Sequence, residues 1–464
     1  MLVRPAHLLL LCIFCPSLAS AQDGVFDLGN KLELFVDSQR IERLEGVKLT
    51  LHSPREAETA IKFDEAWEGV GSAYVTVLKD GDKFRMYYRG ATLNKPEVTC
   101  LAESPDGITW TKPKLGLFEW EGSKENNLVW MDSCTHNFTP FLDTLPGVPA
   151  YQRYKAIAGN GKGQAKGLYS YISADGIQWR LLSDKPGITN GAFDSQNLAY
   201  WDSNRQKYVC YFRVFTDRIR DIAVSTSDDF LTWSDTKLIE MPRPHEHFYT
   251  NATVNYFRAP HYYLAFPKRF IPNRKHRPDH TVTGISDAVL LTSRDGLHFD
   301  RQFKSALIRP GLDIDNWGDR SQMPAWGLHQ TSPTEMSLYY SRHYRVSTAH
   351  MVRGVFRLDG IASAQADYEG GEVLTKPLKF TGKQLVLNFS TSAAGSVRVE
   401  VQDLEGRPLP GYSLDESPEL YGDSISQPYT WSKNLTAAPL AGKPVRLRFV
   451  LKDADLYSYR FADE

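Results

Sequence analysis

The sequence predicts an all-β protein: a five-bladed β-propeller followed by a C-terminal β-sandwich. Aromatic residues make up 12% of the chain, beside 33 Gly and 26 Pro, a composition typical of many short strands joined by tight turns. A turn motif, Ser-x-Asp-Gly-x-x-Trp/Phe, occurs three times, and a fourth, degenerate copy has Phe230 in place of the glycine. The C-terminal part lacks this motif but still alternates between apolar and polar residues, which indicates strands of another kind of sheet.

The N-terminal residues 1–21 have the pattern of a secretory signal peptide. Arg4 precedes an apolar run at residues 8–14, and the small residues 19–21 offer a cleavage site. No later segment approaches the ~20 consecutive apolar residues of a membrane helix. We therefore expect a secreted or periplasmic protein with no membrane attachment after cleavage.

The overall charge argues against a nucleic-acid-binding protein. The chain has 54 Lys and Arg against 55 Asp and Glu, a net charge of −1, whereas nucleic-acid binders carry a basic excess. Cys100, Cys134 and Cys210 remain after signal removal, too few for a disulfide framework and without zinc-site spacing. We expect Cys100 and Cys210 to be buried in strands. No metal or other cofactor is expected, a structural calcium ion is left open, and the oligomeric state is not indicated.

The repeated motif predicts hairpin tips. Its copies begin at Ser104, Ser173, Ser227 and Ser293, at spacings of 69, 54 and 66 residues, which suggests one propeller blade per copy. Glycine supplies the positive φ of the turn, and the Ser and Asp oxygens accept hydrogen bonds from its backbone. The aromatic residue is expected to pack between neighbouring blades. The aspartates are therefore interpreted as structural: Asp106, Asp175, Asp229 and Asp295.

Five blades are predicted, with four or six as the alternatives, and each blade is expected to contribute an inner strand followed by an outer pair. The expected strands are 71–78, 84–88 and 98–102, then 138–142, 154–158 and 168–172, then 198–201, 208–212 and 222–225, then 252–257, 262–266 and 288–292, and finally 324–329, 336–340 and 350–356. Residues 32–36 are expected to close the ring. The predicted propeller domain spans 22–365 and the predicted sandwich 366–464, with strands at 385–389, 396–401 and 444–451.

Polar loops precede the five inner strands and are expected to face the central funnel, where propellers bind ligands. Every one of these loops contains an acid, most of them beside an amide, a histidine or an aromatic residue. Carboxylates transfer protons, amides bind hydroxyl groups and aromatic rings stack on sugars. The loops therefore indicate a glycan site.

Three segments, residues 136–141, 193–197 and 370–377, are similar to secreted planctomycete and verrucomicrobial family-32-like hydrolases. More broadly, the repeat resembles the five-bladed propeller glycoside hydrolases of families 32, 43, 62, 68 and 117. The resemblance implies a glycan-active propeller with Asp, Asp and Glu at the funnel. Blade one lacks the Trp-Met-Asn-Asp-Pro-Asn start of invertase-type enzymes, so the resemblance implies glycoside hydrolysis rather than fructan chemistry in particular.

We expect three catalytic carboxylates, because glycoside hydrolysis uses one protonated and one ionised carboxyl group. Glu246 is the expected general acid, with a pKa raised by burial, Asp194 the base or nucleophile, and Asp319 the orienting carboxylate. They are 52 and 73 residues apart, so ring closure would have to bring them together. A loop cap or a salt bridge is the alternative role of each, and the substitutes are Asp64, Glu68 and Asp132.

The expected substrate-binding residues come from the same funnel loops and from strand ends. The loops contribute His136, Asn137, Gln196, Asn197, His245, His247, Trp317 and Arg320. The second strand of four blades ends in an arginine: Arg89, Arg213, Arg269 and Arg342. A ring of guanidinium groups would select an anionic glycan, such as a sulfated, uronic or sialic one; the alternative is that these arginines pair with acids or pack between blades.

The sequence thus predicts a secreted glycoside hydrolase whose partner is an oligo- or polysaccharide. A non-catalytic glycan-binding propeller is the first alternative. The second is a sialidase-like or phosphorylase-like enzyme, since residues 257–260 contain an Arg-x-Pro element like that of sialidases. The sugar, the linkage and the stereochemical outcome do not follow from the sequence.

Overall fold

The computed structural model describes residues 24–463 apart from 93, 160–164, 243–245 and 281. The predicted signal peptide and His245 lie outside the described residues. The all-β prediction is confirmed, because the regular elements of the described residues are strands and short 3-10 helices. These helices are η1 (Thr135–Asn137), η2 (Ala150–Gln152), η3 (Ile314–Asn316), η4 (Leu414–Glu416) and η5 (Ala438–Leu440). No helix in the described part of the chain is long and apolar enough to cross a membrane.

Five four-stranded antiparallel units follow one another along the chain, and in the first three the strands pair in chain order. Unit 1 consists of β6 (Ala73–Asp80), β7 (Lys83–Gly90), β8 (Val98–Ser104) and β9 (Leu128–Trp130). Unit 2 consists of β10 (Thr139–Leu142), β11 (Tyr154–Gly159), β12 (Leu168–Ser173) and β13 (Arg180–Leu181). Unit 3 consists of β14 (Leu198–Asp202), β15 (Lys207–Thr216), β16 (Ile219–Ser227) and β17 (Lys237–Leu238).

The last two units depart from this simple order. Unit 4 consists of β19 (Val254–Tyr256), β20 (Ala259–Ala265), β23 (Leu291–Ser293) and β24 (Phe299–Asp300). A separate three-stranded sheet accompanies it, made of β18 (His247–Phe248), β21 (Lys268–Ile271) and β22 (Ile285–Ala288). Unit 5 consists of β25 (Pro324–Gln330), β26 (Glu335–Arg342), β27 (His350–Arg357) and, from the N-terminal part, β5 (Arg55–Lys62).

The units are joined into a cycle. β10 lies beside both β6 and β14, and β25 lies beside both β19 and β6. The contact between the last and first units is a parallel pairing of β25 with β6, in which Trp326 is opposite Thr76. Unit 5 therefore lies directly beside unit 1, although their first strands are far apart in the sequence.

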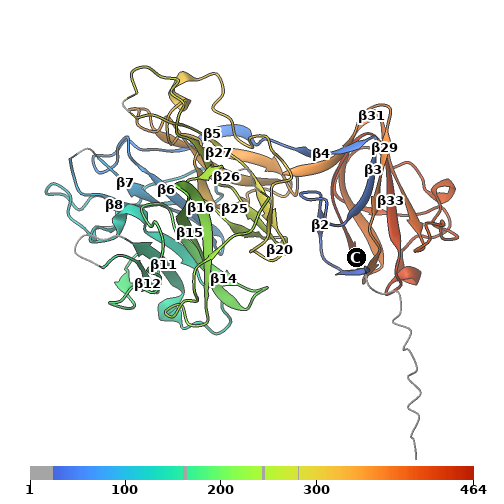
Figure 1. The fold of residues 1–464 in the computed structure, drawn as a ribbon, viewed down its shortest axis with the longest axis horizontal. Coiled ribbons are helices and arrows are strands. Elements are labelled where there is room, and N and C mark those ends of the chain that lie inside the picture. The colour runs from blue at the N-terminus through green and yellow to red at the C-terminus, as the bar shows by residue number, and fades with distance from the viewer. Residues whose placement is uncertain (1–23, 93, 160–164, 243–245, 281, 464) are drawn as a thin grey trace, which may run out of the picture.

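The first four strands, unlike β5, do not belong to the five units. β3 (Ile41–Glu45) pairs with β29 (Gly371–Thr375), and β4 (Val47–Leu51) pairs with β28 (Ala362–Ala366). The remaining strands of this second region are β1 (Phe26–Gly29), β2 (Glu33–Leu34), β30 (Leu378–Phe380), β31 (Gln384–Gln402), β32 (Asp423–Tyr429) and β33 (Arg446–Ala462). Figure 1 shows the five units in one body and β3, β29, β31 and β33 in another.

Strand pairing corrects one detail of the sequence prediction. Residues 32–36 were expected to close the ring, but β2 pairs with β33 of the second region, and β5 is the strand beside β27. The expectation was wrong because a short apolar run does not specify which of two sheets it joins. The domain limits 22–365 and 366–464 stay a prediction, as does a sandwich for the second region, whose sheet combines strands from both ends of the chain.

The four repeated motifs are capped turns, as expected. In the second copy, the Asp175 carboxylate accepts hydrogen bonds from the backbone N–H groups of Ile177 and Gln178, both at 2.8 Å. The Ser173 hydroxyl accepts one from the N–H of Gly176 at 2.8 Å. The equivalent Ser and Asp contacts recur in the other copies.

These turns also connect neighbouring units. Tyr87 of unit 1 donates a hydrogen bond to the carbonyl of Gly176 in unit 2, and Tyr211 of unit 3 donates one to Gly296, which follows β23 of unit 4. Tyr339 of unit 5 donates one to the Gly107 carbonyl of unit 1, which closes the cycle. The motif aromatics Trp179, Trp110 and Phe299 pack on these same tyrosines. Cys100 in β8 and Cys210 in β15 are buried free thiols, as predicted.

We expect Asp175→Ala to lower the free energy of unfolding by about 1 kcal/mol, the usual effect of losing a side-chain cap of the backbone. Turnover by the folded protein should not change, because this turn lies at a contact between units. Chemical denaturation and activity assays check both statements, with Asp184→Ala, an exposed aspartate of the same unit, as the control. A stable but inactive Asp175→Ala protein would contradict the structural role.

Candidate functional site

Three tyrosines from distant parts of the chain share one buried cluster. Tyr74 lies at the start of β6, Tyr249 directly follows β18, and Tyr344 follows β26. Phe270 of β21 and Met323, just before β25, complete this cluster, which also includes Ala73. Since these residues come from units 1 and 5 and from the sheet beside unit 4, only the cyclic arrangement brings them together. We call this group the central cluster. It includes the basic side chains that pack on its tyrosine rings: Arg89, Arg213, Arg220, Lys268 and Arg320.

Four cationic side chains surround the ring of Tyr249. The ring centroid lies 3.6 Å from the Lys268 ammonium nitrogen, 5.0 Å and 5.1 Å from the guanidinium carbons of Arg213 and Arg220, and 5.3 Å from that of Arg320. A fifth cation, Arg89, lies 4.7 Å from the ring of Tyr74. Cations over aromatic faces are attracted by the ring quadrupole, so these rings partly offset the burial of the charges.

Two of the predicted catalytic acids lie beside this cluster. Asp194 forms an ion pair with Arg213, and Asp319 forms ion pairs with Arg320 at 3.4 Å and Arg345 at 3.0 Å. The side chain of Asp194 is 67% exposed, whereas that of Asp319 is only 4% exposed. Asp194 can therefore reach a ligand from solvent, while Asp319 is positioned to orient basic groups from inside.

Glu246 does not lie with the other two acids. It accepts hydrogen bonds from Arg269 at 2.6 Å and from Arg301 at 3.1 Å. Arg269 lies between Lys268 and Phe270 in β21, and side chains alternate between the two faces of a strand. Since Lys268 and Phe270 face the central cluster, Arg269 and its partner Glu246 lie on the opposite face of the sheet.

The pKa of Glu246 is also opposite to the expected one. Burial by itself would raise this pKa, but the hydrogen bond from Arg269 and the charge of Arg301 hold it below its usual value. A general acid must keep its proton near neutral pH. The expected raised pKa is therefore wrong, and Glu246 pairs with two arginines; its role as general acid stays a prediction.

The four strand-end arginines divide into two groups. Arg89 and Arg213 belong to the central cluster. Arg269 is held by Glu246 and Asp287, and Arg342 is held by Glu56. All four arginines pair with acids, as the alternative held, because Arg89 also pairs with Glu97 at 3.5 Å and Arg213 with Asp194. Fewer strand-end arginines surround the central cluster than the sequence suggested, because Arg269 and Arg342 do not belong to it.

Most of the other predicted ligand-binding residues support the loops of the site. Asn137 donates a hydrogen bond to the Phe193 carbonyl and accepts one from the N–H of Gly159 at 2.9 Å. Gln196 donates to the Val75 carbonyl at 3.0 Å, which ties the loop of unit 3 to β6. Asn197 donates to the carbonyls of Phe193 and Ser195 at 3.0 Å and 2.9 Å. The side chains of these buried amides therefore form hydrogen bonds to the backbone of the loops and of β6.

The predicted histidines lie at the edge of the central cluster. His136 packs its ring on Tyr74, with centroids 5.5 Å apart, and contacts Glu97 through Nδ1 at 2.8 Å. His247 accepts a hydrogen bond from the backbone N–H of Arg220 at 3.3 Å. Trp317 lies outside the cluster; its indole N–H donates to the Gly311 carbonyl at 2.9 Å, and its ring packs on His276.

Sequence reasoning missed Arg220, Lys268 and the three tyrosines. One signal could have identified Lys268: it is next to Arg269, which was expected at the end of a strand, so only one of the two side chains can face the funnel. The tyrosines gave no comparable signal, because 23 Tyr are spread along the chain and most of them fit a core strand equally well.

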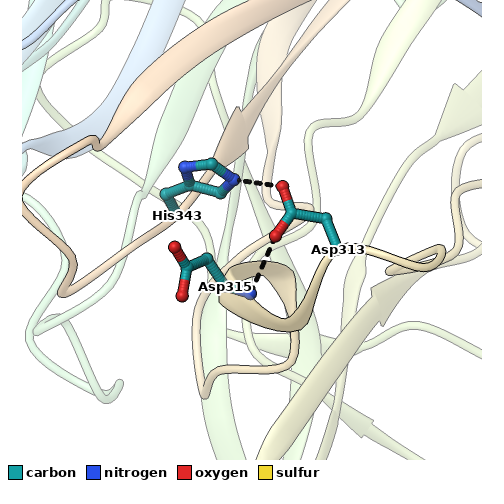
Figure 2. Close-up of side chains that lie close together, drawn as sticks. All are labelled: Asp313, Asp315 and His343. Carbon is teal, nitrogen blue, oxygen red and sulfur yellow. Dashed lines mark hydrogen bonds and ion pairs between the residues drawn. The ribbon is translucent and has the colours of Figure 1, made fainter.

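A second group of polar side chains lies on the loops of unit 5. Asp313, Asp315 and His343 place their ligand atoms within 4.8 Å of one another (Figure 2). His343 already contacts the Asp313 carboxylate through Nε2 at 2.7 Å, and Arg277 donates to Asp315 at 2.5 Å. These contacts already occupy one oxygen of each carboxylate, so the group is a hydrogen-bonded side-chain network.

No known family model matches the sequence, and no curated protein is significantly similar to it. Among solved structures, a glycoside hydrolase is similar with a TM-score of 0.46 at 14% identity, over 66% of this chain and 92% of that one. A thermostable family-43 glycoside hydrolase has a TM-score of 0.43 at 13% identity, over 64% and 93%. An endo-arabinase from Bacteroides thetaiotaomicron has a TM-score of 0.40 at 13% identity, over 65% and 98%. Similarities this distant carry no argument about the reaction of this chain.

Proposed function

We propose that this protein is a glycoside hydrolase built on a five-bladed propeller, with its reaction at the central cluster. The propeller is supported by the cyclic order of the five units and by the pairing of β25 with β6. In propellers, the inner strands of the blades surround a central channel, and ligands bind at its opening. Tyr74 of the cluster lies on such an inner strand, β6, whereas Arg213 and Arg220 come from the second and third strands of unit 3.

The observation that carries this proposal is the joint position of Asp194 and Asp319. They are 125 residues apart in the sequence, yet each pairs with an arginine that packs on the same Tyr249 ring. Glycoside hydrolysis uses a pair of carboxylates near one sugar, and aromatic faces stack on sugar rings. Of these features, the cluster supplies an exposed carboxylate, Asp194, and the aromatic faces, with Asp319 as a supporting carboxylate.

The two acids are suited to different roles. Asp194 is largely exposed and would act on the substrate, as the base that activates water or as the nucleophile. Asp319 is buried and would orient Arg320 and Arg345 through its ion pairs. Tyr74 donates a hydrogen bond to the backbone carbonyl of Asp194 at 3.4 Å, which helps to hold the catalytic loop against β6.

The test is hydrolysis by the purified protein of a panel of oligo- and polysaccharides that includes neutral, uronic and sulfated members. Release of new reducing ends from at least one member is the expected result. Binding without bond cleavage across the panel would contradict the proposal and favour a non-catalytic glycan-binding propeller. A requirement of turnover for inorganic phosphate would favour the phosphorylase alternative.

We also propose that the protein is exported, on the basis of the signal pattern in residues 1–21. Gln22 should then be the first residue of the mature chain. N-terminal sequencing of the exported protein checks this, and a mature chain that retains residues 1–21 would contradict it.

A further inference from the structure

We propose that the central cluster binds an oxyanion, a carboxylate or sulfate group carried by the glycan, between Arg213, Arg220 and Lys268. The proposal names the substrate class of the site described above, so the glycan as carrier of the anion rests on the proposed function. The anion site itself rests on the charges and contacts of the cluster.

The first argument is the balance of charge. Four basic side chains surround Tyr249, whereas the carboxylates that pair with them among the described residues are those of Asp194 and Asp319. Asp319 is also shared with Arg345. Like charges held together away from water are costly unless an opposite charge compensates them. A bound oxyanion would supply the missing negative charge.

Two of the four cations have no carboxylate partner among the described residues. Lys268 is fully buried and donates a hydrogen bond to the backbone carbonyl of Asp319 at 3.3 Å. Arg220 contacts the His247 ring nitrogen at 3.5 Å and otherwise packs on aromatic rings. Both side chains therefore carry hydrogen-bond donors that pair with no carboxylate among the described residues.

Unused hydrogen-bond donors point to the same place. The Nε–H groups of Arg213 and Arg220 are buried and have no hydrogen-bond acceptor among the described residues. Arg213 as a whole is only 4% exposed. Guanidinium groups bind carboxylate and sulfate through two parallel N–H donors, so free Nε–H groups beside a buried cation suit an oxyanion.

The pKa shifts of Lys268 and Arg220 agree with an anion site at the cluster. Burial lowers the pKa of Lys268 well below its usual value. Among the neighbouring charges, that of Arg320 lowers this pKa the most. Burial and the charge of Arg213 also hold the pKa of Arg220 below its usual range. A bound anion would oppose both shifts by favouring the charged forms.

Access to the site is available from the side of Asp194. The carboxylate of Asp194 and the ring of Phe215 are largely exposed, and Phe215 packs on the guanidinium groups of both Arg213 and Arg220. A sugar unit entering here would place an anionic substituent beside the arginines while its glycosidic bond stays near Asp194.

The experiment measures anion binding separately from hydrolysis. Isothermal titration calorimetry with D-glucuronate and with inorganic sulfate, against D-glucose as the neutral arm, is expected to show binding of one or both anions and none of glucose. Arg220→Gln and Lys268→Met should each weaken anion binding at least tenfold. Arg309→Gln, which changes an exposed arginine outside the cluster, should leave it unchanged.

Thermal unfolding of Lys268→Met separates an anion site from a purely structural role. If Lys268 is an uncompensated buried cation, its replacement by Met should leave the melting temperature without anion the same or higher. A lower melting temperature together with unchanged anion affinity would overturn the proposal. So would equal anion affinity of the wild type, Arg220→Gln and Arg309→Gln.

The two proposals fail in different ways. Hydrolysis of neutral glycans with no anion binding at the cluster would overturn the anion site and leave the hydrolase intact. Anion binding that depends on Arg220 and Lys268, with no hydrolysis of any glycan, would leave the anion site intact and overturn the hydrolase.

Discussion

Asp194→Asn is expected to lower kcat about 10³-fold on the glycan that the wild-type protein hydrolyses, within the range for loss of a positioned acid or base. The physical reason is that asparagine keeps the size of the side chain but can neither accept a proton nor attack a sugar carbon. The fold should not change, because the Asp194 side chain is 67% exposed. Initial-rate kinetics and a thermal unfolding curve measure both properties.

Asp228→Asn is the matched control for this prediction. Asp228 is also an exposed aspartate paired with a cation, at 2.6 Å from Lys207, but it lies in a repeat turn away from the central cluster. Its variant should retain wild-type kcat. If Asp194→Asn raises KM but leaves kcat unchanged, Asp194 contributes to binding only, and the reactive carboxylate lies elsewhere.

Asp359→Ala is expected to lower the free energy of unfolding by about 3–5 kcal/mol, the usual cost of removing one member of a buried ion pair. The Asp359 carboxylate accepts hydrogen bonds from Tyr256 at 2.5 Å and from Arg258 at 2.6 Å, both in or beside unit 4. It also accepts hydrogen bonds from Asn388 of β31 at 3.3 Å and from Ser458 of β33 at 2.9 Å. One side chain thus connects the five units to the second region.

Chemical denaturation checks this effect, and two variants serve as controls. Asp359→Asn should cost less than Asp359→Ala, because asparagine accepts the hydrogen bond from Tyr256 and tolerates the positive φ of 63° at this position. Asp423→Asn removes an exposed carboxylate that pairs with Arg357 and should cost less than about 1 kcal/mol. Equal losses for Asp359→Ala and Asp423→Asn would show that the connection contributes little.

The parts of the fold that depend on residues close together in the sequence could be predicted well. The Ser and Asp oxygens of the repeat bond to backbone N–H groups two or three residues away, so the turn is encoded within seven residues. The alternation of apolar residues likewise located the main strands of all five units. The buried thiols Cys100 and Cys210 followed from their positions in such strands.

The candidate site could be predicted only in part. The loops that contain Asp194 and Asp319 were found because a polar segment before a predicted inner strand is recognisable in the sequence. Glu246 met the same criterion, yet its loop leads into the additional sheet of β18, β21 and β22, whose opposite face it occupies. The criterion selects a loop and does not determine the face on which its side chain lies.

By itself, the sequence determined the strands, the capped turns and the position of the acidic loops, because each depends on residues close together in the chain. Only the tertiary structure decided which acidic and basic side chains form pairs. Glu246 meets Arg301 across 55 residues, and Arg342 meets Glu56 across 286. The pKa of a carboxylate and the free charge of an arginine depend on such partners at a few ångströms. The chemistry of the central cluster depends on such long-range contacts too, because Arg213 and Arg320 meet at the ring of Tyr249 although they are 107 residues apart in the sequence.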